Sequence, residues 1–234
     1  HYGAGQMLVC AAGSVDHDDL VQRIGARLGH IGNATSAIRH AASWTGGRKM
    51  AKRDLEQSHI VFGLPAKIDT MTERFSLMAL STLYGGGMSS RLFQQVREKR
   101  GLTYGIGTSL ATFDHAEAIM GQFQASNDKV AEAISVIRAQ WALIAAEGVS
   151  QQELDDAKTY MTGAYPLRFD GNRRIANILV GMQTLGLSSD YPKTRNARIE
   201  AVTLADVKRV AAKLLQPQDL HFTVVGQPTG VVSE

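Results

Sequence analysis

Arg97 and Tyr104 are the two residues of this sequence whose types and spacing could do chemistry together. They stand seven positions apart, at the two ends of a segment that contains a glycine turn. Arginine offers a fixed fork of N–H donors and tyrosine one phenolic donor, so the pair could hold a carbonyl oxygen and stabilise it as it becomes negative. The same spacing is also typical of a surface arginine near a half-buried tyrosine of a strand.

A glycine-rich segment precedes this pair: Gly85, Gly86, Gly87, Met88 and Ser89. Backbone N–H groups at the start of a helix can bind a phosphate, and a short helical pattern follows here. The segment lacks the G-x-x-x-x-G-K-[ST] order, however, and it follows a helix rather than a strand. On local grounds an ordinary break between two helices explains it.

The candidate metal ligands are seven histidines and one cysteine: His1, His17, His30, His40, His59, His115, His221 and Cys10. No histidine has a partner at a recognised ligand spacing, and neither H-E-x-x-H nor H-x-x-E-H occurs. The acidic neighbours of His17 are typical of the first turn of a helix. Cys10, His59 and His221 lie in apolar strand patterns, so we expect no metal site in this chain.

Composition indicates a folded protein. The 234 residues are 44% hydrophobic and 20% charged, which argues against disorder and against a coiled coil. No apolar run reaches the roughly 18 residues that span a bilayer, and the first residues lack the basic region of a signal peptide. We therefore expect a soluble protein without a membrane span. A single cysteine cannot form an internal disulfide.

The charge balance argues against a nucleic-acid partner. Lys and Arg total 25 against 22 for Asp and Glu, and the densest basic cluster, residues 91–100, also contains a glutamate. Binding to a phosphate backbone requires clustered cations rather than a slight excess. A free-standing module that binds an anion or a nucleic acid through this cluster is the weakest of the alternatives.

Apolar periodicity predicts the elements that position these residues. Strands are predicted over residues 7–12, 49–53, 55–64, 104–113, 118–125 and 221–226, with Asp114 and His115 in the turn between the fourth and the fifth. Helices are predicted over residues 16–28, 69–83, 89–100, 130–146, from 150 onward, 173–185, 193–201 and 203–215. Strands grouped early and helices grouped late indicate an α+β fold, with helices packed on one face of a mainly antiparallel sheet.

Two motifs in this frame resemble a known family. Ser-Ser-Arg-Leu-Phe at residues 89–93 is followed by Arg-Glu-Lys-Arg-Gly-Leu-Thr-Tyr at residues 97–104. Together they resemble the signature of the second homologous domain of the pitrilysin and insulinase zinc peptidases, close to bacterial relatives of the mitochondrial processing peptidase. Residues 54–65 resemble a strand of that domain, and residues 7–21 resemble the strand and helix that close the first domain. The resemblance covers nearly the whole chain.

The resemblance implies a fold and a division of the chain. Residues 41–234 would form the second peptidase-family domain, an α+β, processing-peptidase-like (metallohydrolase-like) domain. Residues 1–40 would be the terminal strand and helix of a preceding, mostly absent zinc domain, followed by a linker. Because such a detached strand has unpaired edges, we expect it to dock on an edge of the chain's own sheet or to exchange with another molecule.

The resemblance also implies a function for the singled-out residues. Arg97 and Tyr104 would be the catalytic pair that holds the substrate carbonyl. The start of the family's glycine-rich, substrate-binding loop, which is much shorter here, would correspond to Gly85, Gly86, Gly87, Met88 and Ser89.

The zinc site of the family, an inverted H-x-x-E-H helix with a further glutamate, does not occur in this sequence. The resemblance therefore implies the substrate-binding C-terminal domain of a zinc metalloendopeptidase, inactive alone, whose zinc is bound by a complementary domain or subunit. The implied partners are a peptide substrate, a zinc-binding N-terminal domain or partner subunit, and a homodimer or strand-swapped dimer. A non-catalytic scaffold or peptide-binding subunit of the same fold is the alternative. The basic pI and the single cysteine fit the cytoplasm, the periplasm or an organelle matrix equally well, so the compartment stays open, with the bacterial cytoplasm or periplasm as the expectation for a soluble protein.

Overall fold

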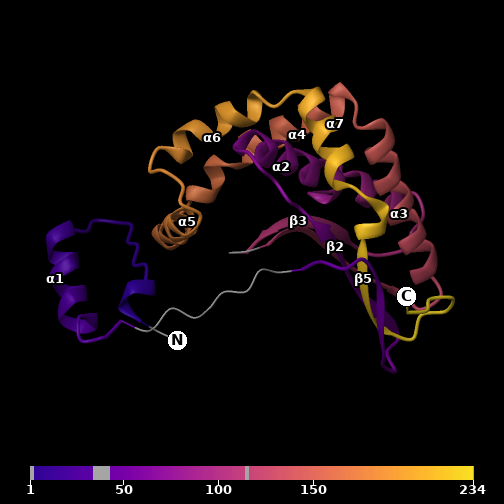
Figure 1. Ribbon diagram of the computed structural model, residues 1–234, viewed down its shortest axis with the longest axis horizontal. Coiled ribbons are helices and arrows are strands. Elements are labelled where there is room, and N and C mark those ends of the chain that lie inside the picture. Colours follow the sequence, from indigo (N-terminus) through magenta and orange to yellow (C-terminus); the bar gives the residue numbers. More distant parts are fainter. Residues whose placement is uncertain (1–2, 34–42, 114–115, 234) are drawn as a thin grey trace. The chain divides into compact units, whose positions relative to one another are not determined.

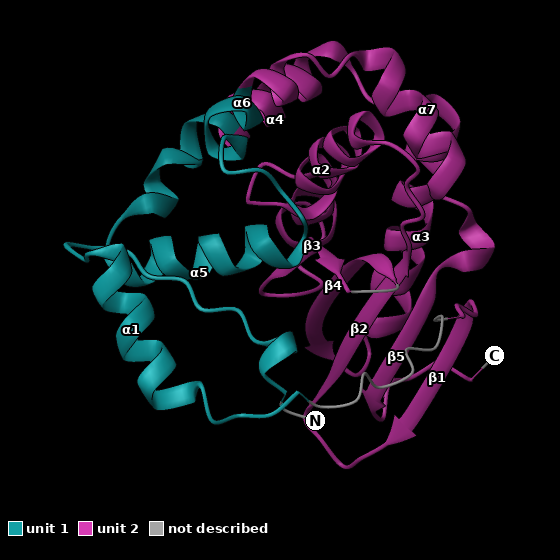
Figure 2. Cartoon of the chain, turned by 60° about the vertical axis from the view of Figure 1, so that its left-hand side comes forward, with its two compact units in different colours: residues 1–40, 162–196 teal, residues 41–161, 197–234 magenta. Residues whose placement is uncertain are grey.

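The computed structural model describes residues 3–33, 43–113 and 116–233. The chain divides into two compact units (Figure 2). The first unit combines residues 1–40 with residues 162–196, and the second combines residues 41–161 with residues 197–234. Arg97 and Tyr104 both belong to the second unit.

A five-stranded sheet forms the frame of the second unit (Figure 1). In spatial order its strands are β1 (Gly47–Lys52), β5 (His221–Gly226), β2 (Gln57–Pro65), β4 (Glu117–Ser126) and β3 (Ile106–Thr112). Only β1 and β5 pair in parallel, and the other neighbours are antiparallel. The expected mainly antiparallel sheet is confirmed. The predicted turn at Asp114 and His115 lies outside the described residues.

The longer helices are α1 (His17–Leu28), α2 (Met71–Gly85), α3 (Val130–Glu147), α4 (Gln151–Ala164), α5 (Asn172–Thr184), α6 (Tyr191–Glu200) and α7 (Leu204–Leu214). The short helical segments are η1 (Ala4–Gln6), η2 (Phe93–Glu98), η3 (Pro166–Phe169) and η4 (Pro217–Asp219). In the second unit α2, α3 and α7 cover one face of the sheet, as expected (Figure 1). Within the described residues, no helix is both long enough and apolar enough to cross a bilayer.

The alternation of side chains along β2 explains why only one face of the sheet is covered. Ile60, Phe62 and Leu64 are buried beneath the helices, whereas His59 and Val61 project to the opposite face and are exposed. The sheet therefore has an apolar face that forms the core and an open face that carries exposed side chains.

An aromatic contact ties α2 to α3 in this core. The rings of Tyr84 and Trp141 meet edge to face with centroids 4.3 Å apart, and both residues are buried. The Tyr84 hydroxyl donates a hydrogen bond of 3.1 Å to the carbonyl oxygen of Ile137. Burial raises the pKa of the Tyr84 phenol, so it remains a neutral donor.

Side-chain caps set the beginnings of three helices, as the sequence predicts. The Thr70 hydroxyl accepts a hydrogen bond of 3.2 Å from the backbone N–H of Glu73 in the first turn of α2. At the start of α4, the side chains of Ser150 and Glu153 each accept a hydrogen bond from the other residue's backbone N–H. The side chains of Thr203 and Asp206 form the same reciprocal pair at the start of α7.

In the first unit the predicted helix is confirmed but the predicted strand is wrong. Asp16 caps α1 by accepting a hydrogen bond of 2.9 Å from the backbone of Asp19. Residues 7–12 form no strand, and Leu8 and Val9 are 50% and 54% exposed. A strand requires a neighbour for its hydrogen bonds, and the described sheet consists of five other strands. Residues 7–12 therefore pair with none of the described strands. Docking of this segment on a sheet edge or its exchange with another molecule stays a prediction.

Candidate functional site

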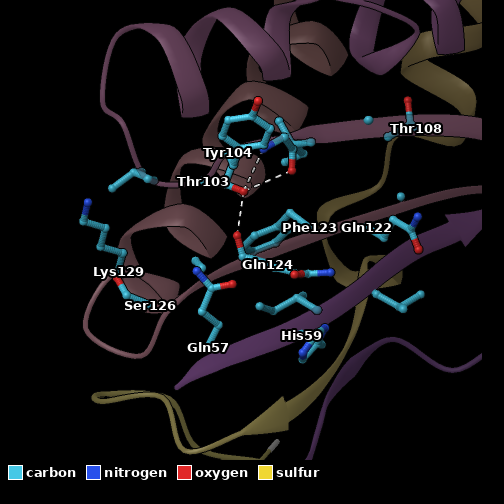
Figure 3. A pocket seen from close by; sticks show the side chains of 18 of the residues that line it. Gln57, His59, Thr103, Tyr104, Thr108, Gln122, Phe123, Gln124, Ser126 and Lys129 are labelled. Atoms are coloured by element: carbon cyan, nitrogen blue, oxygen red, sulfur yellow. Dashed lines mark hydrogen bonds between the residues drawn. The ribbon is translucent and has the colours of Figure 1, made fainter. Parts of the chain in front are cut away.

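A groove of about 1090 Å³ lies on the open face of the sheet (Figure 3). Strands β2, β4 and β3 form its floor, and the segment between η2 and β3 forms one wall. Tyr104 stands at the rim on this wall and is 91% exposed. The predicted strand over residues 104–113 begins only at Ile106, which leaves Tyr104 on a loop.

Buried neighbours hold the loop of Tyr104 in place. Leu102 and Thr103 are buried on either side of the bend, 4% and 8% exposed. The Thr103 hydroxyl donates a hydrogen bond of 2.6 Å to the carbonyl oxygen of Gln124 in β4 and accepts one of 3.3 Å from the backbone of Gly105 (Figure 3). The backbone beside Tyr104 is thus anchored to the floor of the groove.

Arg97 lies on η2, outside the groove lining, and contacts the ring of Tyr104 at the rim. Its guanidinium carbon is 5.4 Å from the centroid of the Tyr104 ring and 4.8 Å from that of Phe93, which are distances of cation–π contacts. One of its terminal nitrogens donates to the carboxylate of Glu98. A guanidinium has five N–H donors, so others remain for a ligand. The structure brings Arg97 and Tyr104 together, and their substrate contact stays a prediction.

The turn at Gly101 produces this approach. Gly101 has φ +58°, a conformation that favours glycine, and its N–H donates to the carbonyl oxygen of Arg97 at 2.8 Å. The N–H of Leu102 donates to the carbonyl oxygen of Val96 at 2.9 Å. The chain therefore reverses after Arg97 and returns Tyr104 to its side. The predicted stop of the short helix at Gly101 agrees with this turn.

Gly85 has a packing role at the end of α2. A Cβ atom at this position would lie 2.3 Å from the Thr108 hydroxyl oxygen and 2.6 Å from the Thr108 nitrogen. The close approach of α2 to β3 therefore requires the absence of a side chain. Gly85 itself lines neither of the two cavities described here.

The other predicted substrate-binding residues, Gly86, Gly87, Met88 and Ser89, line a second cavity of about 350 Å³ beside α4. Their segment does not enter the groove of Tyr104. Met88 is 73% exposed at this cavity. A substrate-binding role for these residues stays a prediction. A substrate bound by them would occupy the second cavity and not the groove beside Tyr104.

An ion pair that the sequence analysis missed borders this second cavity. Arg91 donates from Nε and Nη2 to the two carboxylate oxygens of Glu153, at 2.6 and 2.8 Å. These hydrogen bonds lower the pKa of Glu153 to about 2, helped by the backbone N–H of Ser150. The pair links the segment after α2 to the start of α4. Glu153 lies in the first turn of the helix predicted from residue 150 onward, but its pairing with the distant Arg91 leaves no local signal in the sequence.

The described residues do not fit a zinc site. In residues 3–33, 43–113 and 116–233, no three His, Cys, Asp or Glu side chains lie close enough together to hold a metal ion. His59 faces the groove, whereas the Nδ1 atom of His221 is buried without a hydrogen-bond partner among the described residues, and the His221 ring meets that of Trp44 in a T-shaped contact. The described residues of the groove thus offer hydrogen-bonding groups rather than a metal-ligand set.

Comparisons with known proteins agree with this architecture. Residues 1–161 match the family model described as the peptidase M16 inactive domain. An uncharacterized zinc protease of Mycobacterium tuberculosis is 33% identical over 228 residues, which cover 92% of this chain and 50% of the relative. A non-peptidase homolog from Helicobacter pylori is 25% identical over 223 residues, 94% of this chain and 52% of that protein. The chain spans about half the length of these relatives.

Solved structures share the fold. A crystal structure of a peptidase M16 inactive domain from Pseudomonas fluorescens has a TM-score of 0.79 at 23% identity, and covers 95% of this chain and 53% of that one. A chain of complex III2 from Candida albicans has a TM-score of 0.76 at 16% identity, and the match covers 92% of this chain and 54% of that one.

Proposed function

Because this chain belongs to the peptidase M16 family, whose inactive domain it matches, we propose that it is the substrate-holding part of a zinc metallopeptidase. Relatives about twice as long are named zinc proteases, which supports a zinc-binding part outside this chain, in the same polypeptide or in a partner subunit. Since the described residues fit no zinc site, the chain's own part is to bind and orient the peptide.

The convergence of Arg97 and Tyr104 at an open groove carries this proposal. We expect the Tyr104 hydroxyl at the rim and the remaining N–H groups of the neighbouring Arg97 to donate to one carbonyl oxygen of a peptide bound in the groove. Such hydrogen bonds strengthen as the oxygen becomes negative, so the pair would favour the transition state over the bound substrate. The contacts of Arg97 with Tyr104 and Phe93 keep the guanidinium oriented before the peptide binds.

The full-length protein with its zinc-binding part provides the test. In the variant Arg97→Ala/Tyr104→Phe we expect hydrolysis of a quenched fluorescent peptide to fall by at least about 100-fold in kcat/KM, while the zinc content stays unchanged. Hydrolysis at the wild-type rate would contradict the proposal.

A scaffold or peptide-binding subunit is the second candidate, and the non-peptidase homolog from Helicobacter pylori favours it. A full-length protein that binds zinc and hydrolyses no peptide, also in the presence of neighbouring family members, would support this alternative. Peptide hydrolysis that depends on Arg97 would exclude it.

A further inference from the structure

Polar side chains without protein partners cover the floor of the groove. Gln57 and His59 project from β2 and Gln122 and Gln124 from β4, with His59 directly opposite Gln124 (Figure 3). Within the described part of the chain, these four exposed side chains have no hydrogen-bond partner. The floor is therefore an array of free donors and acceptors.

The spacing of this array matches an extended peptide. Side chains two positions apart on a strand face the same side and lie about 7 Å apart, which is also the repeat of an extended peptide. Nucleobases, in contrast, require exposed aromatic rings for stacking. Besides Tyr104 at the rim and the imidazole of His59 on the floor, the described lining contains the ring of Phe123, which is 3% exposed and belongs to the core face. Because one imidazole offers little area for stacking, the floor favours a peptide over a nucleic acid.

The charges around the groove are predominantly positive. None of the described lining residues is Asp or Glu, and Lys129 is the lysine among them. The adjoining segments 97–104 and 126–129 contain four cations and two carboxylates. Both carboxylates are engaged, because Glu98 accepts from Arg97, and Asp128 accepts from the side chain of Ser126.

Lys129 is placed to bind an anionic group at the end of the floor. Its Nζ donates a hydrogen bond of 3.0 Å to the carbonyl oxygen of Gly101, which fixes the ammonium group at the wall that carries Tyr104. The ammonium group keeps two further N–H donors for a ligand. The residue is exposed, and its side chain makes no cap bond at the start of α3.

We propose that the groove selects extended peptide segments that carry acidic side chains, and that Lys129 is a specificity-determining residue that binds a peptide carboxylate. The amides of Gln122 and Gln124 hydrogen-bond the same segment along its length. A segment rich in lysine would lose this ion pair and meet repulsion from the basic rim. This inference rests on the proposed peptide-holding function.

Binding of labelled peptides to the full chain tests this inference by fluorescence anisotropy. Three peptides share one sequence frame and carry glutamate, glutamine or lysine at every second position. We expect the glutamate peptide to bind at least about five-fold more tightly than the lysine peptide at low ionic strength, and the difference to shrink at 0.5 M salt. Lys129→Gln should weaken the preference and Lys129→Glu should abolish or reverse it.

A matched control is Lys52→Gln, since Lys52 is exposed on β1 outside the groove and should leave the preference unchanged. The inference that Lys129 selects acidic peptides would be overturned if the three peptides bound equally well. It would also be overturned if folded Lys129→Glu kept the preference for the glutamate peptide; either result would leave the peptide-holding function standing. If the wild type binds none of the three peptides, the acidic-peptide inference and the proposed peptide-holding function both fail. Tighter and steeply salt-dependent binding of single-stranded DNA would overturn the assignment to peptides. Circular dichroism verifies that each variant is folded.

Discussion

The guanidinium carbon of Arg97 lies 5.4 Å from the centroid of the Tyr104 ring, because the chain reverses direction between the two residues. The contact joins a charged donor to the residue that stands at the rim of the groove. Because each side chain helps to place the other, the two should act as one unit rather than as independent donors.

A double-mutant cycle tests this unit. We expect Arg97→Lys and Tyr104→Phe each to lower kcat/KM of the full-length protein by about 10- to 100-fold, since lysine lacks the guanidinium fork and phenylalanine lacks the donor. The double variant should lose clearly less than the product of the two single effects. Steady-state kinetics measure the cycle, and Arg53→Lys is the control because Arg53 is exposed just after the end of β1. Strictly multiplicative losses would show that the two residues act separately.

Gly85→Ala should destabilise the second unit. The added methyl group would meet the Thr108 hydroxyl and backbone nitrogen at 2.3 and 2.6 Å, so α2 and β3 would have to separate. We expect a loss of about 1 to 3 kcal/mol in the free energy of unfolding, measured by urea denaturation. Gly87→Ala is the matched control, because no atom lies within 4 Å of its added Cβ. Equal stability of the two variants would mean that the contact relaxes without cost.

The ion pair of Arg91 and Glu153 predicts a pH dependence of stability. The pKa of Glu153 falls from 4.5 to about 2 in the folded chain, so the folded state favours the charged carboxylate. Its stabilisation is complete above about pH 4.5 and is lost as the pH falls toward 2. Because the Glu153 side chain is 32% exposed, solvent screening reduces its worth to about 1 to 2 kcal/mol.

The comparison of wild type with Glu153→Gln measures this contribution. The difference in the free energy of unfolding should be largest at neutral pH and should shrink steadily between pH 4.5 and pH 2. Glu147→Gln, at the exposed end of α3, serves as control and should show no such trend. A difference that does not depend on pH would assign the effect to packing instead.

Tyr84→Phe should destabilise the core, where Tyr84 of α2 packs against α3. The variant removes the donor of the 3.1 Å hydrogen bond and leaves the carbonyl of Ile137 buried without it. We expect a loss of about 1 to 2 kcal/mol in thermal or chemical unfolding. Tyr160→Phe, at a tyrosine that is 59% exposed, should change stability by less than about 0.5 kcal/mol. A neutral Tyr84→Phe would show that this hydrogen bond contributes nothing net.

Local patterns in the sequence were sufficient for most of the fold. The alternation in β2 and the capping residues Thr70, Ser150 and Thr203 are local signals, and the structure has the corresponding strand and helix starts. Residues 7–12 show the limit of such signals. An apolar run has the composition of a strand, but it becomes one only where another strand accepts its hydrogen bonds.

The candidate site was predictable only in part. The motif around Arg97 and Tyr104 indicated a pair, and Gly101 indicated the turn that brings them together. The polar floor was not predicted, because Gln122 and Gln124 are remote in sequence from β2 and acquire a common face with it only through strand register. Likewise, the pairing of Arg91 with Glu153 depends on tertiary packing alone.

The anchoring of Thr103 has a thermodynamic consequence for ligand binding. Its hydrogen bonds to Gln124 and Gly105 order the backbone of the rim during folding, before any ligand arrives. Association then sacrifices mainly the conformational entropy of the incoming chain, and little of the receptor's. A preorganised rim of this kind leaves more of the contact free energy available for binding, because little of it is spent on ordering the receptor.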